Sequence, residues 1–283
     1  MTVFPQQKET NIESNNGEME AVYSEYVLAN QGKEASSRFA ALAALYDTRT
    51  MDHLASLGVA RGWRCLEVGG GSGTIAKWLA DRVGPMGYVL ATDVDTRFLE
   101  PLRSPTLEVL SHDIASDPLP EAAFDLIHTR LILMHLPRRD TALTRMISSL
   151  KPGGWLLMEE YDSYSIRPDP AVYAGETSLK THLAMLRFLE ASGVDRQYGR
   201  LLPGRMRNRG LTGIGAEAQL FMWQHDSPGI AMMRANFEQL REPMINGKYI
   251  TQSQQFEEDL ARLDDPAFMM PSSILWTVWG RRP

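Results

Sequence analysis

The chain has 283 residues, of which 43% are hydrophobic and 23% charged, so it has the composition of a globular protein that can bury a sizeable core. Its 35 acidic residues outnumber its 29 basic ones, and the net charge of −6 argues against a protein that binds nucleic acid through phosphate contacts. The single cysteine, Cys65, excludes an intramolecular disulfide and a cysteine-cluster metal site. We therefore predict one core with additions, no nucleic-acid partner and no metal.

The first 20 residues are polar and lack hydrophobic periodicity, which predicts a flexible tail. They contain no basic start followed by an apolar stretch, and about 18 apolar residues never run together. We accordingly expect a cytoplasmic protein with no membrane partner. Residues 21–60 are expected to form an N-terminal helical cap, with a helix that opens at Ser36 and closes at Gly58.

Strand and helix signals alternate from residue 61 to residue 162. Short apolar strands are predicted at residues 64–69, 87–93, 107–113, 124–130 and 155–162. Between these strands, apolar residues at helical spacing predict helices over residues 74–84, 96–103 and 140–154. This alternation predicts a parallel sheet with right-handed crossovers, whose ligand site lies at the carboxyl ends of the strands.

Beyond residue 162 the pattern loosens. Helices are predicted over residues 171–193, 196–210, 229–242 and 251–265, and strands over residues 216–225 and 273–283. We interpret the helical segments at about 164–214 and 226–266 as a lid on a core that extends over residues 61–283. The basic run at residues 205–210 is interpreted as a solvated helix end rather than a polyanion site.

The segment "LEVGGGSG" at residues 66–73 predicts a strand, a glycine turn and the start of a helix. A dinucleotide fingerprint would place its third glycine at Thr74, and a Walker loop would need a following Gly-Lys-Ser/Thr, so the spacing fits neither. The turn still allows a nucleoside to approach the backbone closely. Asp93 ends the second predicted strand 20 residues after Gly73, where a carboxylate can bind ribose hydroxyls. The third strand ends at Asp113 and Ile114, which could bind an exocyclic amine and a purine face.

In this combination the sequence resembles the class I S-adenosylmethionine-dependent methyltransferases. The segments "LEVGGGSG", "ATDVD", "HDI", "FDLIHTRLILMHLP" and "LKPGGWLLMEE" match that superfamily's successive motifs, in order, over about residues 60–162. The flanking segments resemble bacterial enzymes that methylate small secondary metabolites. The resemblance implies an α/β fold with a Rossmann-like, doubly wound, mostly parallel seven-stranded sheet, and S-adenosylmethionine as the cofactor.

The resemblance also implies a set of cofactor-binding residues at the ends of the strands. Glycines line the methionyl part with support from an acidic residue, aspartates bind the ribose and adenine, and the end of the fourth strand borders the transferred methyl group. The expected set is Glu67, Gly69, Gly70, Gly71, Gly73, Asp93, Val94, Asp113, Ile114, Thr129 and Arg130.

Three residues are candidates for a catalytic role. His135, just after the fourth predicted strand, is the best candidate for a general base because imidazole titrates near neutrality, although packing against the next helix would also explain it. Glu160 follows the fifth strand and is expected to face the same crevice, and Tyr26, with Tyr23, lies in a segment that could close over the cofactor. His128 is expected to be structural.

Several features bear on the methyl acceptor and on oligomeric state. Fifteen methionines, among them Met134, Met232, Met233, Met269 and Met270, suggest an adaptable apolar pocket. We expect methylation of an oxygen, nitrogen or electron-rich carbon atom of a small, aromatic or apolar metabolite, with a homodimer left open. A nicotinamide-dependent oxidoreductase and a cofactor-binding protein with a non-methylating role, such as cyclisation, are the alternatives. A surface role is favoured for Arg38 over contact with the methionyl carboxylate.

Overall fold

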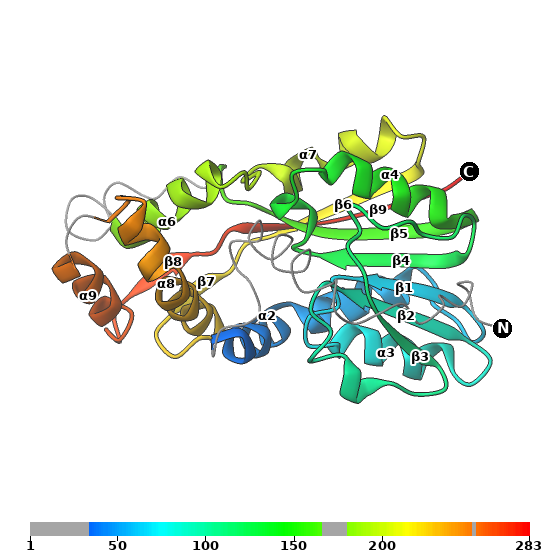
Figure 1. Cartoon of the computed structure of the whole chain (residues 1–283), viewed down its shortest axis with the longest axis horizontal. Helices are drawn as coiled ribbons and strands as arrows, with labels where there is room; N and C mark the ends of the chain where they lie inside the picture. Colours follow the sequence, from blue (N-terminus) through cyan, green and yellow to red (C-terminus); the bar gives the residue numbers. More distant parts are fainter. Residues whose placement is uncertain (1–33, 166–179, 251–252) are drawn as a thin grey trace, which may run out of the picture.

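The computed structural model describes residues 34–165, 180–250 and 253–283. Its main sheet has seven strands in the order β3-β2-β1-β4-β5-β9-β6 (Figure 1). The five strands from β3 to β5 are parallel, and β9 runs antiparallel to both of its neighbours. The strands are β1 (Arg64–Val68), β2 (Tyr88–Asp93), β3 (Leu107–Ser111), β4 (Phe124–Arg130), β5 (Leu150–Asp162), β6 (Thr212–Gln219) and β9 (Ile274–Arg281). The predicted Rossmann-like, mostly parallel seven-stranded sheet is confirmed.

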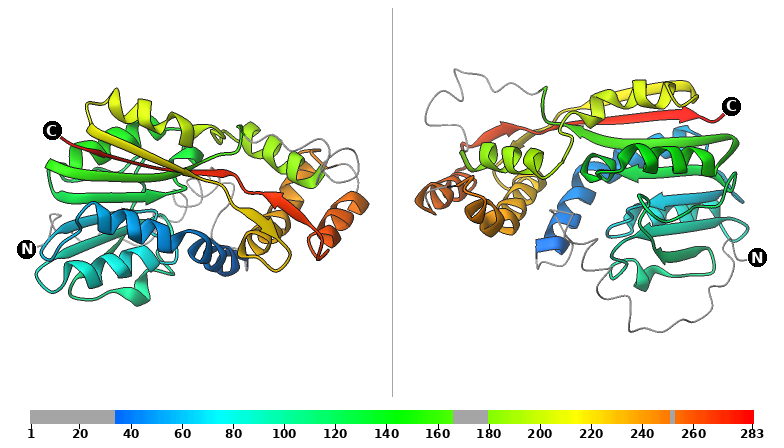
Figure 2. Two further views of the ribbon diagram at one scale, coloured as in Figure 1. Left: turned by 180° about the vertical axis from the view of Figure 1, so that it is seen from behind. Right: turned by 45° about the horizontal axis from the view of Figure 1, so that its top comes forward.

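Helices cover both faces of this sheet, as Figures 1 and 2 show. Helices α2 (Glu34–Ser56) and α3 (Thr74–Val83) lie on one face, whereas α4 (Arg139–Ser149) and α7 (Tyr198–Arg207) lie on the other. Successive side chains of a strand point to opposite faces, and the buried side chains of β1, β2, β4 and β5 divide between two hydrophobic cores. This explains why the central strands have near-continuous apolar sequences rather than alternating ones.

A second group of elements lies at one end of the sheet (Figure 2). It consists of α6 (Lys180–Ala191), α8 (Pro228–Asn246), α9 (Ser253–Arg262) and a two-stranded sheet of β7 (Met222–Gln224) and β8 (Met269–Pro271). The first residue of β9, Ile274, pairs with Asp162, the last residue of β5. The group, called the lid below, therefore lies at the carboxyl ends of the parallel strands.

The structure differs from the sequence-based expectations in several elements. Helix α2 includes Ser36, so this serine is not the start of the helix. Helix α7 falls inside the range expected for a lid, but it packs against β5 and β9. The single strand expected over residues 216–225 is two strands in different sheets, because backbone and side-chain hydrogen bonds between Phe221 and Ser272 separate β6 from β7. Tyr23, Tyr26 and the expected tail lie outside the described residues.

Candidate functional site

A cavity of about 280 Å³ lies between the carboxyl ends of the strands and the lid. Its volume is just below the usual range for small-molecule sites, which is about 300–1,000 Å³. One end is lined by the glycine turn after β1 and by residues that follow β2, β3 and β4. The other end is lined mainly by α6, α8, β7 and β8, and α2 contributes Arg38, Phe39 and Leu42 along one side. We call these two parts the strand end and the lid end.

The glycine turn forms the floor of the strand end. Gly69 and Gly71 have positive φ values of 70° and 53°, which favour glycine. A Cβ at Gly69 would lie 2.2 Å from Cδ1 of Ile132, and one at Gly71 would lie 3.0 Å from the ring of Phe39. The two glycines are therefore required both by backbone conformation and by the close approach of neighbouring side chains.

Carboxylates from three strand ends line the same part of the cavity. Asp93 is 7% exposed and accepts hydrogen bonds from the backbone N–H groups of Gly71, at 3.0 Å, and Asp95, at 3.1 Å. Burial raises the pKa of Asp93, while these two N–H groups oppose the rise. Asp113 accepts hydrogen bonds from the N–H of Ala115 at 2.8 Å and the hydroxyl of Ser116 at 2.5 Å, so it also holds the turn after β3. Glu67 is the third carboxylate.

Most of the expected cofactor-binding residues line the cavity, with two exceptions. Those that line it are Glu67, Gly69, Gly70, Gly71, Asp93, Val94, Asp113, Ile114 and Arg130. Gly73 lies outside the lining and precedes α3, and a Cβ there would lie 2.3 Å from Leu102. Thr129 is fully buried within β4 and also lies outside the lining. Both residues therefore support the site rather than face the cavity.

A buried polar network lies beneath the strand end. His128 stands opposite Glu67 in the β1–β4 pairing, and its Nδ1 lies 2.7 Å from a Glu67 oxygen. Its Nε2 lies 3.4 Å from Glu159 on β5, which also accepts a hydrogen bond from Thr50 of α2. Arg130 extends the network by donating to Asp47 of α2 at 2.7 Å. The network thus fastens α2 across the ends of three strands.

The charges in this network are mutually dependent. Burial alone would lower the pKa of His128, but the adjacent carboxylates of Glu67 and Glu159 outweigh it and raise the pKa to about 9. Burial alone would raise the pKa of Glu159, but His128 and Arg130 lower it to about 2. An imidazolium between two carboxylates is therefore the stable arrangement, which agrees with the structural role expected of His128.

His135 lies in the turn that follows β4, within the short 3-10 helix η2 (Leu133–His135), and lines the cavity. Burial, together with the charges of Arg38 and Arg139, lowers its pKa to about 4. His135 is therefore uncharged at neutral pH and able to accept a proton. A pKa this low also makes the imidazole a weaker base than an ordinary histidine.

Glu160 holds this turn from beneath instead of facing the cavity. Its carboxylate accepts hydrogen bonds from the backbone N–H groups of Ile132, Leu133 and Met134, at 2.7 to 3.3 Å. It is fully buried and lies outside the cavity lining, and burial raises its pKa to about 8 despite the three N–H groups. The expectation that Glu160 faces the crevice is thus corrected, and its geometry is that of a positioning residue.

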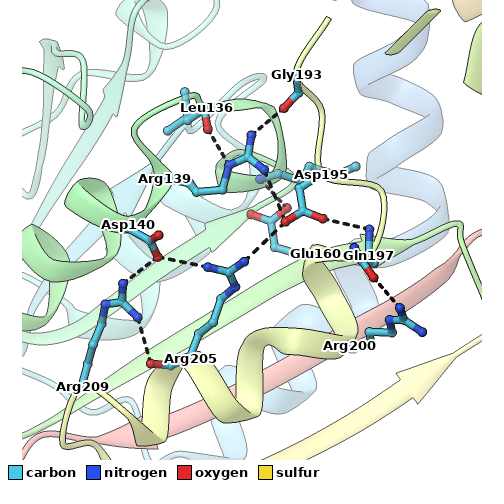
Figure 3. A network of polar contacts seen from close by, with 11 residues as sticks. Leu136, Arg139, Asp140, Glu160, Gly193, Asp195, Gln197, Arg200, Arg205 and Arg209 are labelled. Carbon is cyan, nitrogen blue, oxygen red and sulfur yellow. Dashed lines mark hydrogen bonds and ion pairs between the residues drawn. The ribbon is translucent and has the colours of Figure 1, made fainter. Parts of the chain in front are cut away.

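Arginines hold the same turn from the outside, as Figure 3 shows. Arg139 donates to the carbonyl groups of Leu136 and Gly193 and pairs with Asp195 at 3.3 Å, while the N–H of Asp195 donates to the carbonyl of Met134. Within the basic run 205–210, Arg205 and Arg209 both pair with Asp140, as Figure 3 also shows. Much of the charge in that run is therefore neutralised within the chain.

The lid end contains residues to which the sequence motifs did not point. Its lining includes His182, Trp223 and Asn236 among apolar side chains, with Met232 and Met233 as expected. The only available signal was helical spacing, because no local motif marks these positions. Arg38 also differs from expectation, since it is 4% exposed, lines the cavity and donates to Gln239 of α8. A surface role for Arg38 is wrong.

Within residues 34–165, 180–250 and 253–283, no group of three His, Cys, Asp or Glu side chains is placed to hold a metal ion. No helix in the same ranges is long and apolar enough to cross a membrane.

Comparison with known proteins gives a consistent result. Residues 66–158 match the family model described as "Methyltransferase domain". The chain is 31% identical to methyltransferase str3 of Strobilurus tenacellus over 163 residues, which are 56% of each protein. It is 33% identical over 134 residues to the ubiquinone/menaquinone biosynthesis C-methyltransferase UbiE of Laribacter hongkongensis, covering 41% of this chain and 55% of that protein. The chain thus spans about half the length of these relatives.

Solved structures support the same fold. Phosphoethanolamine N-methyltransferase 2 of Haemonchus contortus, in complex with phosphomonomethylethanolamine and S-adenosylhomocysteine, aligns with a TM-score of 0.54 at 14% identity, over 83% of this chain and 52% of that one. The order of motifs, the strand order and the family match agree with one another. Residues 66–158 thus match a methyltransferase domain, and the chain has the motif order and the fold of the class I S-adenosylmethionine-dependent methyltransferases, which use S-adenosylmethionine as their cofactor.

Proposed function

We propose that this chain transfers a methyl group from S-adenosylmethionine to an oxygen, nitrogen or electron-rich carbon atom of a small, neutral, largely apolar molecule. The observation that carries the proposal is the two-part cavity. Its strand end is lined by carboxylates and glycine backbone, and its lid end by methionines and other apolar side chains. One end suits the cofactor and the other suits an apolar acceptor.

The chemistry of the strand end fits the cofactor. Glu67, Asp93 and Asp113 are acidic, and Arg130, which lines the same end, is paired with Asp47 at 2.7 Å. Such a set suits a ligand with ribose hydroxyls, an amino group and a positive sulfur, and it disfavours a pyrophosphate. We assign Asp93 to the ribose, Asp113 and Ile114 to the adenine, and the turn with Glu67 to the methionyl part. S-adenosylmethionine supplies an electrophilic methyl group on its sulfonium when bound.

The residues of this chain would contribute positioning, exclusion of water and proton acceptance. Phe39 and Leu42 of α2 wall the cavity beside the glycine turn, and the lid covers the strand ends. Holding two reactants in alignment can supply about 7 kcal/mol or more of a reaction barrier. His135 would accept the proton that an oxygen or nitrogen acceptor loses.

The lid end favours an acceptor without charge. No aspartate, glutamate or lysine of the lid lines the cavity in the described ranges. Arg196, which follows α6, pairs with Glu190 at 3.0 Å, and Arg38 of α2 donates to Gln239 of α8. An ammonium group would find no carboxylate there, and a phosphate would have to compete with Glu190. The names of the relatives, which include quinone biosynthesis, are compatible with a neutral aromatic acceptor.

Calorimetry and a transfer assay test this proposal. The wild-type chain should bind S-adenosylhomocysteine and should not bind NADH, since the turn has no pyrophosphate spacing. With methyl-labelled cofactor, label should enter neutral phenols or quinols and not phosphoethanolamine. Binding of NADH in place of S-adenosylhomocysteine would overturn the assignment. Cofactor binding without transfer to any acceptor of these classes would instead favour a non-methylating role.

A further inference from the structure

Two lid helices present similar faces to the cavity. On α6 the lining residues are His182, Met185, Leu186 and Leu189, and on α8 they are Met232, Met233 and Asn236. These positions repeat at intervals of three and four residues, so each set lies on one side of its helix. Each apolar face therefore carries one polar side chain directed at the same cavity.

Three buried polar atoms in this region have no hydrogen-bond partner among the described residues. They are Nδ1 of His182, Nε1 of Trp223 and Oδ1 of Asn236. All three residues line the lid end. Buried polar atoms in folded proteins are almost always hydrogen-bonded, so unpartnered atoms grouped in one cavity indicate a ligand that completes them.

The chemistry of these atoms restricts the ligand. The indole N–H of Trp223 can only donate, and Oδ1 of Asn236 can only accept. Burial, assisted by the charge of Arg196, lowers the pKa of His182 to about 4, so its imidazole is neutral at physiological pH. A group that both accepts and donates, such as a hydroxyl, satisfies this set. A charged group gains no opposite charge from these three side chains, and the nearby Arg196 is already paired with Glu190.

The spacing of these residues along α8 also gives an approximate length for the ligand. The ring of Trp223 covers Gly229 at the start of α8, where an added Cβ would lie 2.2 Å from it. Gly229 and Asn236 are seven residues apart, which is roughly 10 Å along a helix axis. Met232 and Met233 occupy the interval. An elongated apolar body with polar groups at its ends matches this arrangement.

Resting on the proposed function, we propose that Trp223, Asn236 and His182 form a specificity-determining subsite that binds neutral hydroxyl or carbonyl groups of an aromatic acceptor. Trp223 donates to an oxygen of the acceptor, and Asn236 accepts from a hydroxyl. The methionines between them contact the hydrocarbon body. The acceptor class is thereby narrowed to neutral molecules that carry oxygen groups, with phenols and quinols as the simplest examples.

Calorimetry on the full chain loaded with S-adenosylhomocysteine tests this subsite, with naphthalene, 2,6-dihydroxynaphthalene and naphthalene-2-sulfonate as probes. The diol should bind most tightly and the sulfonate most weakly. Trp223→Phe and Asn236→Leu should each weaken the diol about two- to tenfold, since each removes one hydrogen bond, and should leave naphthalene unaffected.

Matched variants separate this effect from a general loss of structure. Trp276→Phe removes another buried indole N–H outside the cavity lining, and Asn208→Leu changes an exposed amide. Neither should alter binding of the diol. The subsite is refuted if the lid variants weaken naphthalene as much as the diol, or weaken neither. If the wild type does not bind S-adenosylhomocysteine, the proposed function itself is refuted. A failure of the subsite and a failure of the proposed function therefore give different results.

Discussion

The two ends of the cavity are built in different ways. At the strand end, polar groups are held by other groups of the chain, as when Asp93 accepts two backbone N–H groups and His128 lies between Glu67 and Glu159. At the lid end, polar atoms of Trp223 and Asn236 have no partner within the described part of the chain. The comparison suggests a preorganised cofactor site beside an acceptor site that the ligand itself must complete.

The largest effect is expected where a buried charge loses its partner. Replacing His128 with leucine leaves Glu67 and Glu159 as buried carboxylates without the imidazolium between them. Removal of one partner from a buried ion pair costs about 3–5 kcal/mol of unfolding free energy. Urea denaturation measures this loss of unfolding free energy. The control is Lys77→Ala, which removes an exposed i,i+4 pair with Asp81 and should lower the unfolding free energy by only about 0.3–0.5 kcal/mol. Equal costs would contradict the view that the strand end is preorganised by buried charge.

Stability should also depend on pH through the same histidine. The carboxylates raise the pKa of His128 from 6.5 to about 9 in the folded chain, so its contribution is complete below pH 6.5 and is lost as pH rises through 9. The difference in unfolding free energy between the wild type and His128→Gln should shrink by about 1.4 kcal/mol per pH unit across this window. Glu160 contributes to the pH dependence of both proteins, so the difference removes it. A constant difference would mean that His128 is neutral.

At the junction of the two ends, His135→Ala should slow turnover. Loss of a general base lowers rates by about 100-fold or more, while affinity for S-adenosylhomocysteine should hardly change. Because burial lowers the pKa of His135 to about 4, the wild-type rate should not fall between pH 8 and pH 6 through protonation of this residue. His225→Ala, which changes a histidine outside this cavity, is the control. A His135 variant as fast as the wild type would leave orientation alone as the source of catalysis.

The contrast between the strand end and the lid end also explains how much of the site could be predicted from the sequence. Glycine spacing, Asp93 and Asp113 are local features at strand ends, so the fold and most of the strand-end lining could be predicted. Gly73 and Thr129 lie outside the cavity lining, because motif membership does not distinguish a residue that supports the turn from one that faces the cavity. The burial of Arg38 depends on contact with Gln239, which is 201 residues away along the chain, and no local pattern encodes such a pairing.

Asp93→Ala tests whether the carboxylate at the strand end binds the cofactor. Removing the carboxylate should weaken binding of S-adenosylhomocysteine by about 1–3 kcal/mol, because the ribose hydroxyls lose a charged partner. Calorimetry measures the change. Asp95→Ala is the matched control, since Asp95 pairs with Arg97 and lies outside the cavity lining. If both variants bind equally well, Asp93 at the end of β2 only holds the turn.

The smallest effect is expected for conservative changes in the lid. Met232→Leu and Met233→Leu keep nearly the same volume and should change the unfolding free energy by less than about 1.5 kcal/mol. Both side chains are buried against the lid end, so S-adenosylhomocysteine affinity should stay at the wild-type value while the relative affinities for differently shaped apolar probes shift, because methionine adapts its shape more readily than leucine. Calorimetry on the same two variants measures the affinity for S-adenosylhomocysteine and the affinities for the apolar probes. A loss of cofactor affinity would show that the lid methionines act on the strand end, and the cavity would then have to be treated as a single site.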